Sequence, residues 1–102
     1  MYYTSLVVSI DNENPVIADC PTDQSSDTDA GVATATIFWT EPTATDNSGT
    51  QTLTSTHVPG DTFSIGTTAV TYTSEDDAGN TDTCTFNVIL TGVFILSFQI
   101  SK

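Results

Sequence analysis

Residues 83–90 read TCTFNVIL, and every second side chain of this stretch is apolar. Successive side chains of an extended strand point to opposite faces, so four of them share one face: Cys84, Phe86, Val88 and Leu90. A period of two predicts a β-strand that is buried on that face. Cys84 is in phase with the buried face, which is where a structural disulfide is expected.

The same alternation recurs on both sides of this strand. Residues 32–39 read VATATIFW, and we interpret the face that carries Trp39 as inward, with Phe38 on the other face and only partly covered. Three further strands are predicted at residues 15–19, 51–57 with Leu53 inward, and 68–74 with Val70 and Tyr72 inward. No segment shows the 3.6-residue period of a helix, and the abundant threonines favour pleated strands.

Turn residues separate these strands. Asp, Asn and Gly, which tolerate positive φ or cap their own turns, occur at residues 29–31, 46–49, 59–61, 65–66 and 77–80. Several short strands with regular turns indicate a sandwich or a barrel. A buried Trp39 beside a bridge between distant strands favours an all-β sandwich.

The chain contains two cysteines, Cys20 and Cys84. An even number fits a disulfide, which implies an oxidising, extracellular compartment. A bridge that closes a loop of roughly 60 residues stabilises a fold by about 4 kcal/mol in the loop-entropy account. The alternative at this point is a pair of buried free thiols.

The charge is strongly acidic. The chain contains thirteen Asp and Glu residues and a single basic residue, Lys102, so its formal net charge is −12. Nucleic acids and anionic membranes need basic side chains, so neither is an expected partner. The acidic balance instead favours cations, basic protein surfaces or simple solubility.

An ordered series of motifs then points to a known family. It runs DNENP (11–15), CP (20–21), IFWTEP (37–42), ATDNSG (44–49), PGDTF (59–63), IGTTAVTY (65–72), DAGN (77–80) and CTF (84–86). This series resembles the hyalin repeat, or HYR, domain. The resemblance implies an immunoglobulin-like, fibronectin III-like antiparallel β-sandwich. It also implies tandem copies in secreted or cell-surface proteins and a role in adhesion. Ser74 departs from the family, which often has a small apolar residue there.

Three segments are expected along the chain. Residues 1–10 contain a short apolar strand at 5–10, which we interpret as the last strand of a preceding repeat. Residues 11–91 form the HYR domain. Residues 92–102 form a hydrophobic tail that is too short to span a bilayer. The tail is an extra edge strand, the start of a truncated anchor or an unnatural sequence end, and the sequence does not separate these.

Calcium is the one cofactor that the sequence suggests. Hard cations bind carboxylate and carbonyl oxygens from loops. Three acidic clusters supply the candidate ligands Asp11, Glu13, Asn14, Asp46, Asn47, Asp76, Asp77 and Asn80, with Glu75 beside the last group. The spacing is not that of an EF-hand. The plainer interpretation is that these side chains cap turns and keep the surface soluble.

Catalysis is not expected. His57 is the single histidine, and although Ser55 and Asp61 lie near it in sequence, no nucleophile elbow accompanies them. Trp39 is interpreted as a core residue, with a sugar-stacking platform as the alternative.

The sequence therefore predicts a non-enzymatic, extracellular adhesion or matrix module. Its expected partners are neighbouring repeats and cell-surface or matrix proteins. The competing functions are a passive spacer and an accessory glycan-binding module of a secreted protein.

Overall fold

The computed structural model describes residues 13–28, 30–46 and 49–92, which form eight β-strands and no helix. The all-β prediction is therefore confirmed. Among these residues no helix is long and apolar enough to cross a membrane. The strand predicted at residues 5–10 and nearly all of the 92–102 tail lie outside the described residues.

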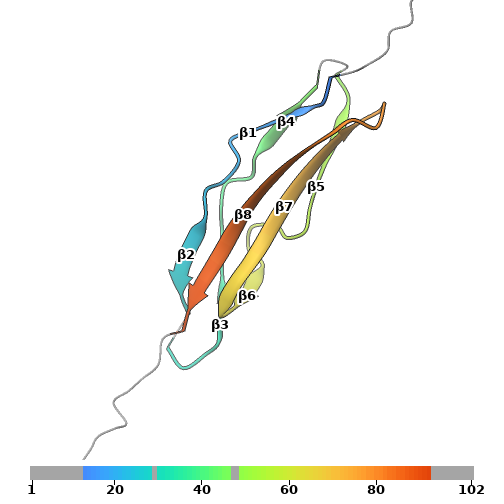
Figure 1. Cartoon of the computed structure of the whole chain (residues 1–102). Coiled ribbons are helices and arrows are strands. Elements are labelled where there is room, and N and C mark those ends of the chain that lie inside the picture. Colours follow the sequence, from blue (N-terminus) through green and yellow to red (C-terminus); the bar gives the residue numbers. More distant parts are fainter. Residues whose placement is uncertain (1–12, 29, 47–48, 93–102) are drawn as a thin grey trace, which may run out of the picture.

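The larger layer is a four-stranded sheet in the order β2-β8-β7-β5 (Figure 1). Its centre is a long antiparallel hairpin of β7 (Gly66–Asp76) and β8 (Thr81–Thr91). Strand β5 (Gln51–Ser55) pairs antiparallel with β7, whereas β2 (Gln24–Asp27) pairs parallel with β8. One parallel pair therefore modifies the expected antiparallel arrangement.

The second layer is built from two short pairs. Strand β4 (Thr43–Thr45) pairs with β1 (Val16–Ala18), and β3 (Thr34–Thr36) pairs with β6 (Thr62–Ser64). Because β3 and β4 belong to one stretch of chain, this stretch links the two pairs into a layer. Ile37 and Phe63 from this layer are buried in one core cluster with Val70 and Phe86 of the four-stranded sheet. The arrangement is compatible with the predicted immunoglobulin-like β-sandwich.

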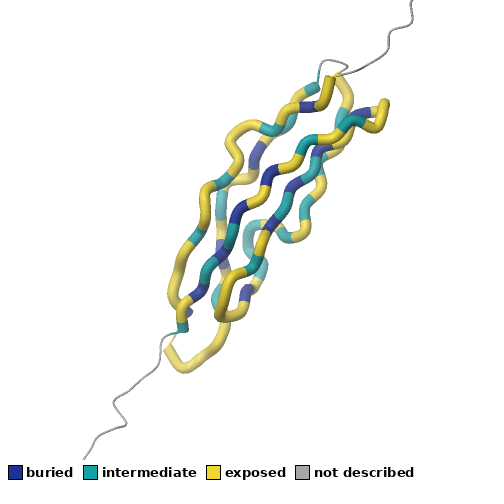
Figure 2. Tube along the Cα trace, viewed as in Figure 1, coloured by how far each residue is buried: buried dark blue, intermediate teal, exposed yellow. Residues whose placement is uncertain are grey.

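The core follows the alternation of the long hairpin (Figure 2). The inward residues of β7 and β8 were predicted correctly and are buried: Val70, Tyr72, Cys84, Phe86, Val88 and Leu90. Trp39 and Leu53 are partly buried and pack against this cluster. The period of two in the sequence therefore identified both the strands and their buried faces.

The segment predicted as a strand at 32–39 differs from the prediction. Strand β3 covers only its centre, because Ile37 bonds to a turn instead of a strand: its N–H donates to Asp61 O (3.2 Å) and its carbonyl accepts from Gly60 N (2.8 Å). Phe38 was expected to be only partly covered, and it is 70% exposed. Its ring lies outside, over Gly60, where an added Cβ would stand 3.3 Å from a ring carbon.

Ser74 is a polar residue buried on the inward face of β7. The residue is 0% exposed, and its Oγ has no hydrogen-bond partner within the described part of the chain. A desolvated hydroxyl without a partner costs about 1–3 kcal/mol. We therefore expect Ser74→Ala to raise the free energy of unfolding by about 1 kcal/mol in urea denaturation. Ser25→Ala, at an exposed site on β2, is the matched control and should change it little. A loss of stability in Ser74→Ala would contradict the prediction.

Candidate functional site

The disulfide lies where the chain crosses from one layer of the sandwich to the other. It joins Cys20 to Cys84, with the two Cα atoms 5.8 Å apart, so the predicted pairing is confirmed. Cys84 is buried on β8, whereas Cys20 lies in the connection between β1 of one layer and β2 of the other. A second bond holds the same connection, because Asn87 N on β8 donates to Asp23 Oδ1 (2.8 Å). The connection at 19–23 is therefore attached to the sheet at two points.

Asp19 begins this connection in an unusual backbone conformation. Its φ is 61°, the one positive φ of a non-glycine residue in the described chain. Asp tolerates the left-handed region better than most residues because its short polar side chain can bond locally. The turn at Asp19 separates β1 from the segment that contains Cys20 and Pro21.

Core residues fix the position of the Trp39 ring. Its ring makes edge contacts with Phe63 and Phe86, with ring centroids 6.0 Å and 5.2 Å apart. Its Nε1 donates to the Tyr72 hydroxyl (2.8 Å). These contacts agree with the prediction that Trp39 belongs to the core, although the ring is only partly buried.

The Tyr72 hydroxyl extends this chain of hydrogen bonds by donating to Glu41 Oε2 (3.1 Å). Burial raises the pKa of Tyr72 above its ordinary value, because desolvation disfavours the phenolate. The hydrogen bond from Trp39 acts in the opposite direction, and the Glu41 carboxylate raises the pKa further. Tyr72 therefore keeps its proton in the folded state at pH values where an exposed tyrosine loses it.

This shift makes stability depend on pH in the alkaline range. Below about pH 10 both the folded and the unfolded states hold the Tyr72 proton. Above it the unfolded state loses the proton first, so stability falls as pH rises, by at most about 1.4 kcal/mol per pH unit. We expect Tyr72→Phe to be about 1 kcal/mol less stable at neutral pH, since it loses both bonds, but to lack this alkaline loss. Denaturant titrations at pH 8 and above pH 10 measure both effects. Equal alkaline losses in the two proteins would contradict the assignment.

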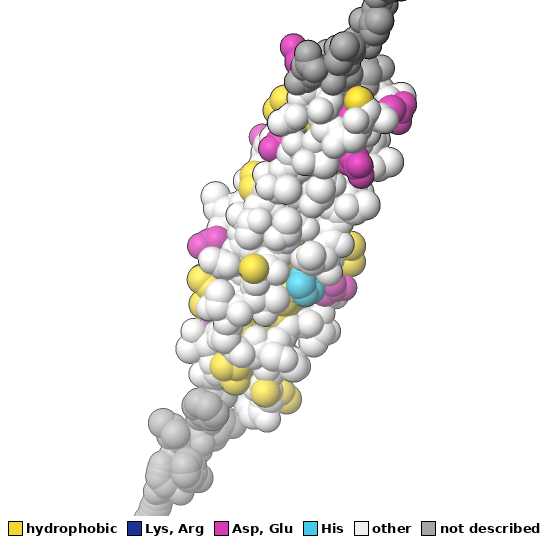
Figure 3. Space-filling view, turned by 45° about the vertical axis from the view of Figure 1, so that its right-hand side comes forward, with side chains coloured by type: hydrophobic (Ala, Val, Ile, Leu, Met, Phe, Trp, Pro, Cys, Tyr) yellow, Lys and Arg dark blue, Asp and Glu magenta, His cyan; other side chains and the backbone are white. Residues whose placement is uncertain are grey.

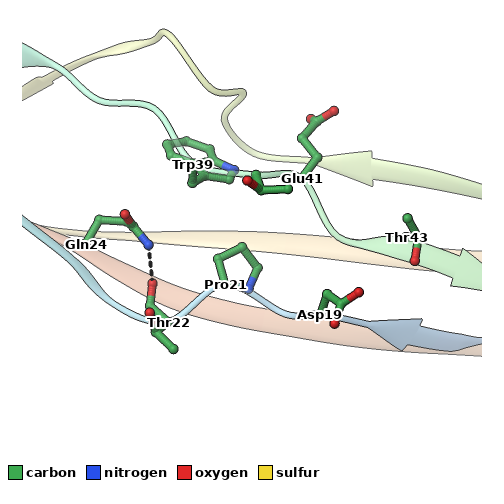
Figure 4. A pocket seen from close by; sticks show the side chains of 8 residues that line it. Asp19, Pro21, Thr22, Gln24, Trp39, Glu41 and Thr43 are labelled. Carbon is green, nitrogen blue, oxygen red and sulfur yellow. Dashed lines mark hydrogen bonds between the residues drawn. The ribbon is translucent and has the colours of Figure 1, made fainter.

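A groove of about 540 Å³ is lined by Asp19 and Pro21, the two chain neighbours of the disulfide-bonded Cys20 (Figure 4). One wall comes from the segment that begins at Trp39, and the other from the connection that contains Pro21. Together they supply an aromatic ring, carboxylates, an amide and hydroxyls: Asp19, Pro21, Thr22, Gln24, Trp39, Thr40, Glu41 and Thr43. The Gln24 amide Nε2 donates to Thr22 O (2.6 Å), which fixes its orientation.

The candidate calcium ligands among the described residues lie at one end of the sandwich, here named the acidic pole. The pole comprises the start of β1, Asp46 after β4 and the β7–β8 turn. The pairings Val16↔Thr45 and Gln51↔Asp76 bring these three regions to the same end. Figure 3 shows several acidic side chains near this end and no Lys or Arg on the visible face.

Hydrogen bonds tie the parts of the acidic pole together. Asn80 Nδ2 donates to Glu13 O (3.2 Å) and to Asp76 Oδ2 (3.0 Å), and Thr50 Oγ1 donates to Asp77 Oδ2 (2.9 Å). Asp76 is 5% exposed, and its Oδ1 accepts from Ala78 N and Asn80 N. Asp76 and Asn80 thus shape the turn, as the plainer interpretation expects.

The calcium prediction itself stays a prediction. Within residues 13–28, 30–46 and 49–92, no three His, Cys, Asp or Glu side chains are placed to hold a metal ion. Two candidates, Asp11 and Asn47, lie outside the described residues, and Asn14 is exposed beside Glu13. The structure brings the described clusters to one pole without arranging them as a coordination sphere.

The residues around His57 have structural contacts. The His57 ring packs against Phe63 with centroids 5.1 Å apart, and its Nδ1 lies 2.9 Å from Thr56 Oγ1. Asp61 Oδ2 accepts from Val58 N (3.0 Å), so this carboxylate caps its own turn. His57 and Asp61 thus have structural contacts of their own.

Sequence reasoning missed the groove. Its walls come from two segments that are separated in the chain, and no motif joins Asp19 or Gln24 to Trp39. The available signal was the single Trp, for which a surface platform was weighed against a core position. In the structure the Trp39 ring packs on the core and also lines the groove.

Comparison with known proteins identifies the family. The HYR domain family matches residues 10–90. The chain is 45% identical over 87 residues to hyalin of Lytechinus variegatus and 45% identical over 86 residues to hyalin of Strongylocentrotus purpuratus. It is also 40% identical over 81 residues to the sushi, von Willebrand factor type A, EGF and pentraxin domain-containing protein 1 of Rattus norvegicus. No solved structure gives a significant match.

These alignments cover most of the chain but little of each relative. They include 84%, 81% and 76% of this chain, and 16%, 7% and 2% of the three relatives. The HYR match over residues 10–90 contains both cysteines and all of the eight strands except the last residue of β8. The chain belongs to the HYR domain family.

Proposed function

We propose that the chain is a non-enzymatic adhesion module of an extracellular repeat protein, in which it contacts neighbouring repeats and cell-surface or matrix proteins. The observation that carries the proposal is the HYR domain match over residues 10–90, with 45% identity to two hyalins. The Cys20–Cys84 disulfide supports an oxidising, extracellular location.

The path of the chain supports a tandem arrangement. Residue 13 lies at the acidic pole, and β8 ends with residue 91 at the opposite end of the sandwich (Figure 1). A module with entry and exit at opposite ends can be joined head to tail without folding the chain back. Neighbouring repeats would then meet end to end, with the acidic pole at the junction.

Calcium at this junction is the finer part of the proposal. The ligands would come from Asp11, Glu13, Asn14, Asp46, Asn47, Asp76, Asp77 and Asn80, completed by groups of the adjoining repeat. Calorimetry with calcium on one module and on two linked modules tests it. We expect the linked pair to bind calcium. Asp77→Asn should weaken this binding, whereas Asp27→Asn, on β2, should not change it. Absence of heat in both proteins would reject the calcium site and leave the adhesion proposal intact.

Cell attachment tests the function itself. Surfaces coated with the folded module should retain cells, and soluble module added in excess should compete. A coat of an unrelated acidic β-sandwich of equal charge controls for non-specific effects. A passive spacer predicts no retention above this control, and that result would reject the adhesion proposal.

A further inference from the structure

We propose that the groove beside the disulfide binds an arginine side chain of a partner protein. This inference rests on the proposed function in that it assigns a site to a protein contact. The ligand class follows from the lining residues, which include an aromatic ring, two carboxylates and no basic side chain.

The groove offers mainly hydrogen-bond acceptors. Asp19 and Glu41 are carboxylates, and one N–H of the Gln24 Nε2 group donates to Thr22 O (2.6 Å), so the amide offers its oxygen and its second N–H. The remaining side-chain donors of the lining are threonine hydroxyls and the second N–H of Gln24. A guanidinium carries five N–H donors and no acceptor, so it complements such a surface. A neutral sugar has no charge to pair with the two carboxylates, so it complements the same surface less well.

Trp39 supplies a stacking surface for a planar cation. Phe63 and Phe86 contact its ring, and Tyr72 accepts its N–H, so its orientation is set before any ligand arrives. Arginine stacks on the face of tryptophan more often than lysine does, because its charge is spread over a flat, weakly hydrated group. Pro21 lies on the opposite wall in Figure 4 and is held next to the disulfide.

The charge of the chain favours the same ligand. No basic residue lines the groove, and the chain carries a formal net charge of −12 with one basic residue, Lys102. A field of this sign attracts cationic side chains and accelerates their encounter, most strongly at low salt. Asp19, which lies next to Cys20, is placed to pair with the cation, whereas Glu41 also accepts from Tyr72.

Trp39 is the single tryptophan of the chain, so its fluorescence reports on the groove. The probe is Nα-acetyl-arginine amide, titrated into the oxidised protein at low salt. The matched ligands are the citrulline analogue, which keeps the shape without the charge, and the lysine analogue. We expect a saturable change with arginine, weaker binding of lysine and no saturation with citrulline.

Variants locate the binding. Asp19→Asn retains a side chain that tolerates the left-handed conformation but removes the charge, and it should weaken arginine binding about two- to fivefold. Asp27→Asn, an equal charge change on β2 outside the groove, should leave the affinity unchanged. Glu41→Gln is the second variant if Asp19→Asn does not fold.

Three outcomes would overturn the proposal. These are no saturable response to arginine, equal responses to arginine and citrulline, or saturation by methyl glycosides in place of arginine. The last result would assign the groove to glycans. Cell attachment does not enter these measurements, so failure of the arginine site and failure of the adhesion proposal are distinguishable.

Discussion

Replacing both cysteines with alanine is expected to lower the free energy of unfolding by about 4 kcal/mol. The disulfide closes a loop of sequence separation 64 and restrains the unfolded chain accordingly. In the folded state it also attaches the crossover between β1 and β2 to β8. Single domains have total stabilities of about 5–15 kcal/mol, so the loss is large. Urea denaturation of the Cys20→Ala, Cys84→Ala protein measures it.

Thr22→Ala is the control for this pair of substitutions. Thr22 is an exposed residue of the same crossover, and its replacement should change stability by less than about 0.5 kcal/mol. If the cysteine variant loses no more stability than Thr22→Ala, the bridge does not stabilise the sandwich.

Phe86→Ala is expected to cost about 3–5 kcal/mol, the usual range for removing a buried phenylalanine. Phe86 is 3% exposed, and its ring contacts Trp39 (5.2 Å) and Tyr72 (6.5 Å) between ring centroids. Its loss would therefore leave a cavity between the two layers and remove support from the Trp39 ring. Thermal and urea unfolding, with Trp39 fluorescence as the probe, would detect both effects.

The chain offers a matched control for this prediction. Phe38→Ala makes the same chemical change at a residue that is 70% exposed, and it should alter stability by less than about 0.5 kcal/mol. Equal losses in the two variants would contradict the two-layer core, in which Phe86 is inside and Phe38 is outside.

Much of the fold could be predicted because burial leaves a periodic pattern. Strands β7 and β8 alternate cleanly, and their inward residues form the centre of the core. Strand β2 was not predicted, because its sequence QSSD lies at a sheet edge with little burial and so carries no apolar pattern. Strand β2 pairs parallel with β8 because the connection at residues 19–23 carries the chain from one layer to the other. A local sequence pattern does not encode this crossover.

The sites were harder to predict than the strands. The acidic clusters were visible in the sequence, but a carboxylate that caps a turn, as Asp76 does, has the same sequence signature as one that binds calcium. The groove depends on how Asp19 and Pro21 lie across from Trp39 once the layers have packed. Such a juxtaposition arises only from the tertiary structure.

The most direct measurement is peptide mapping, by mass spectrometry without reduction, of the protein recovered from outside the cell. A stable extracellular sandwich predicts one linked pair of fragments, one carrying residue 20 and the other residue 84, that separates after a reducing agent is added. Two free thiols in that material would contradict both the Cys20–Cys84 disulfide and the extracellular assignment that rests on it.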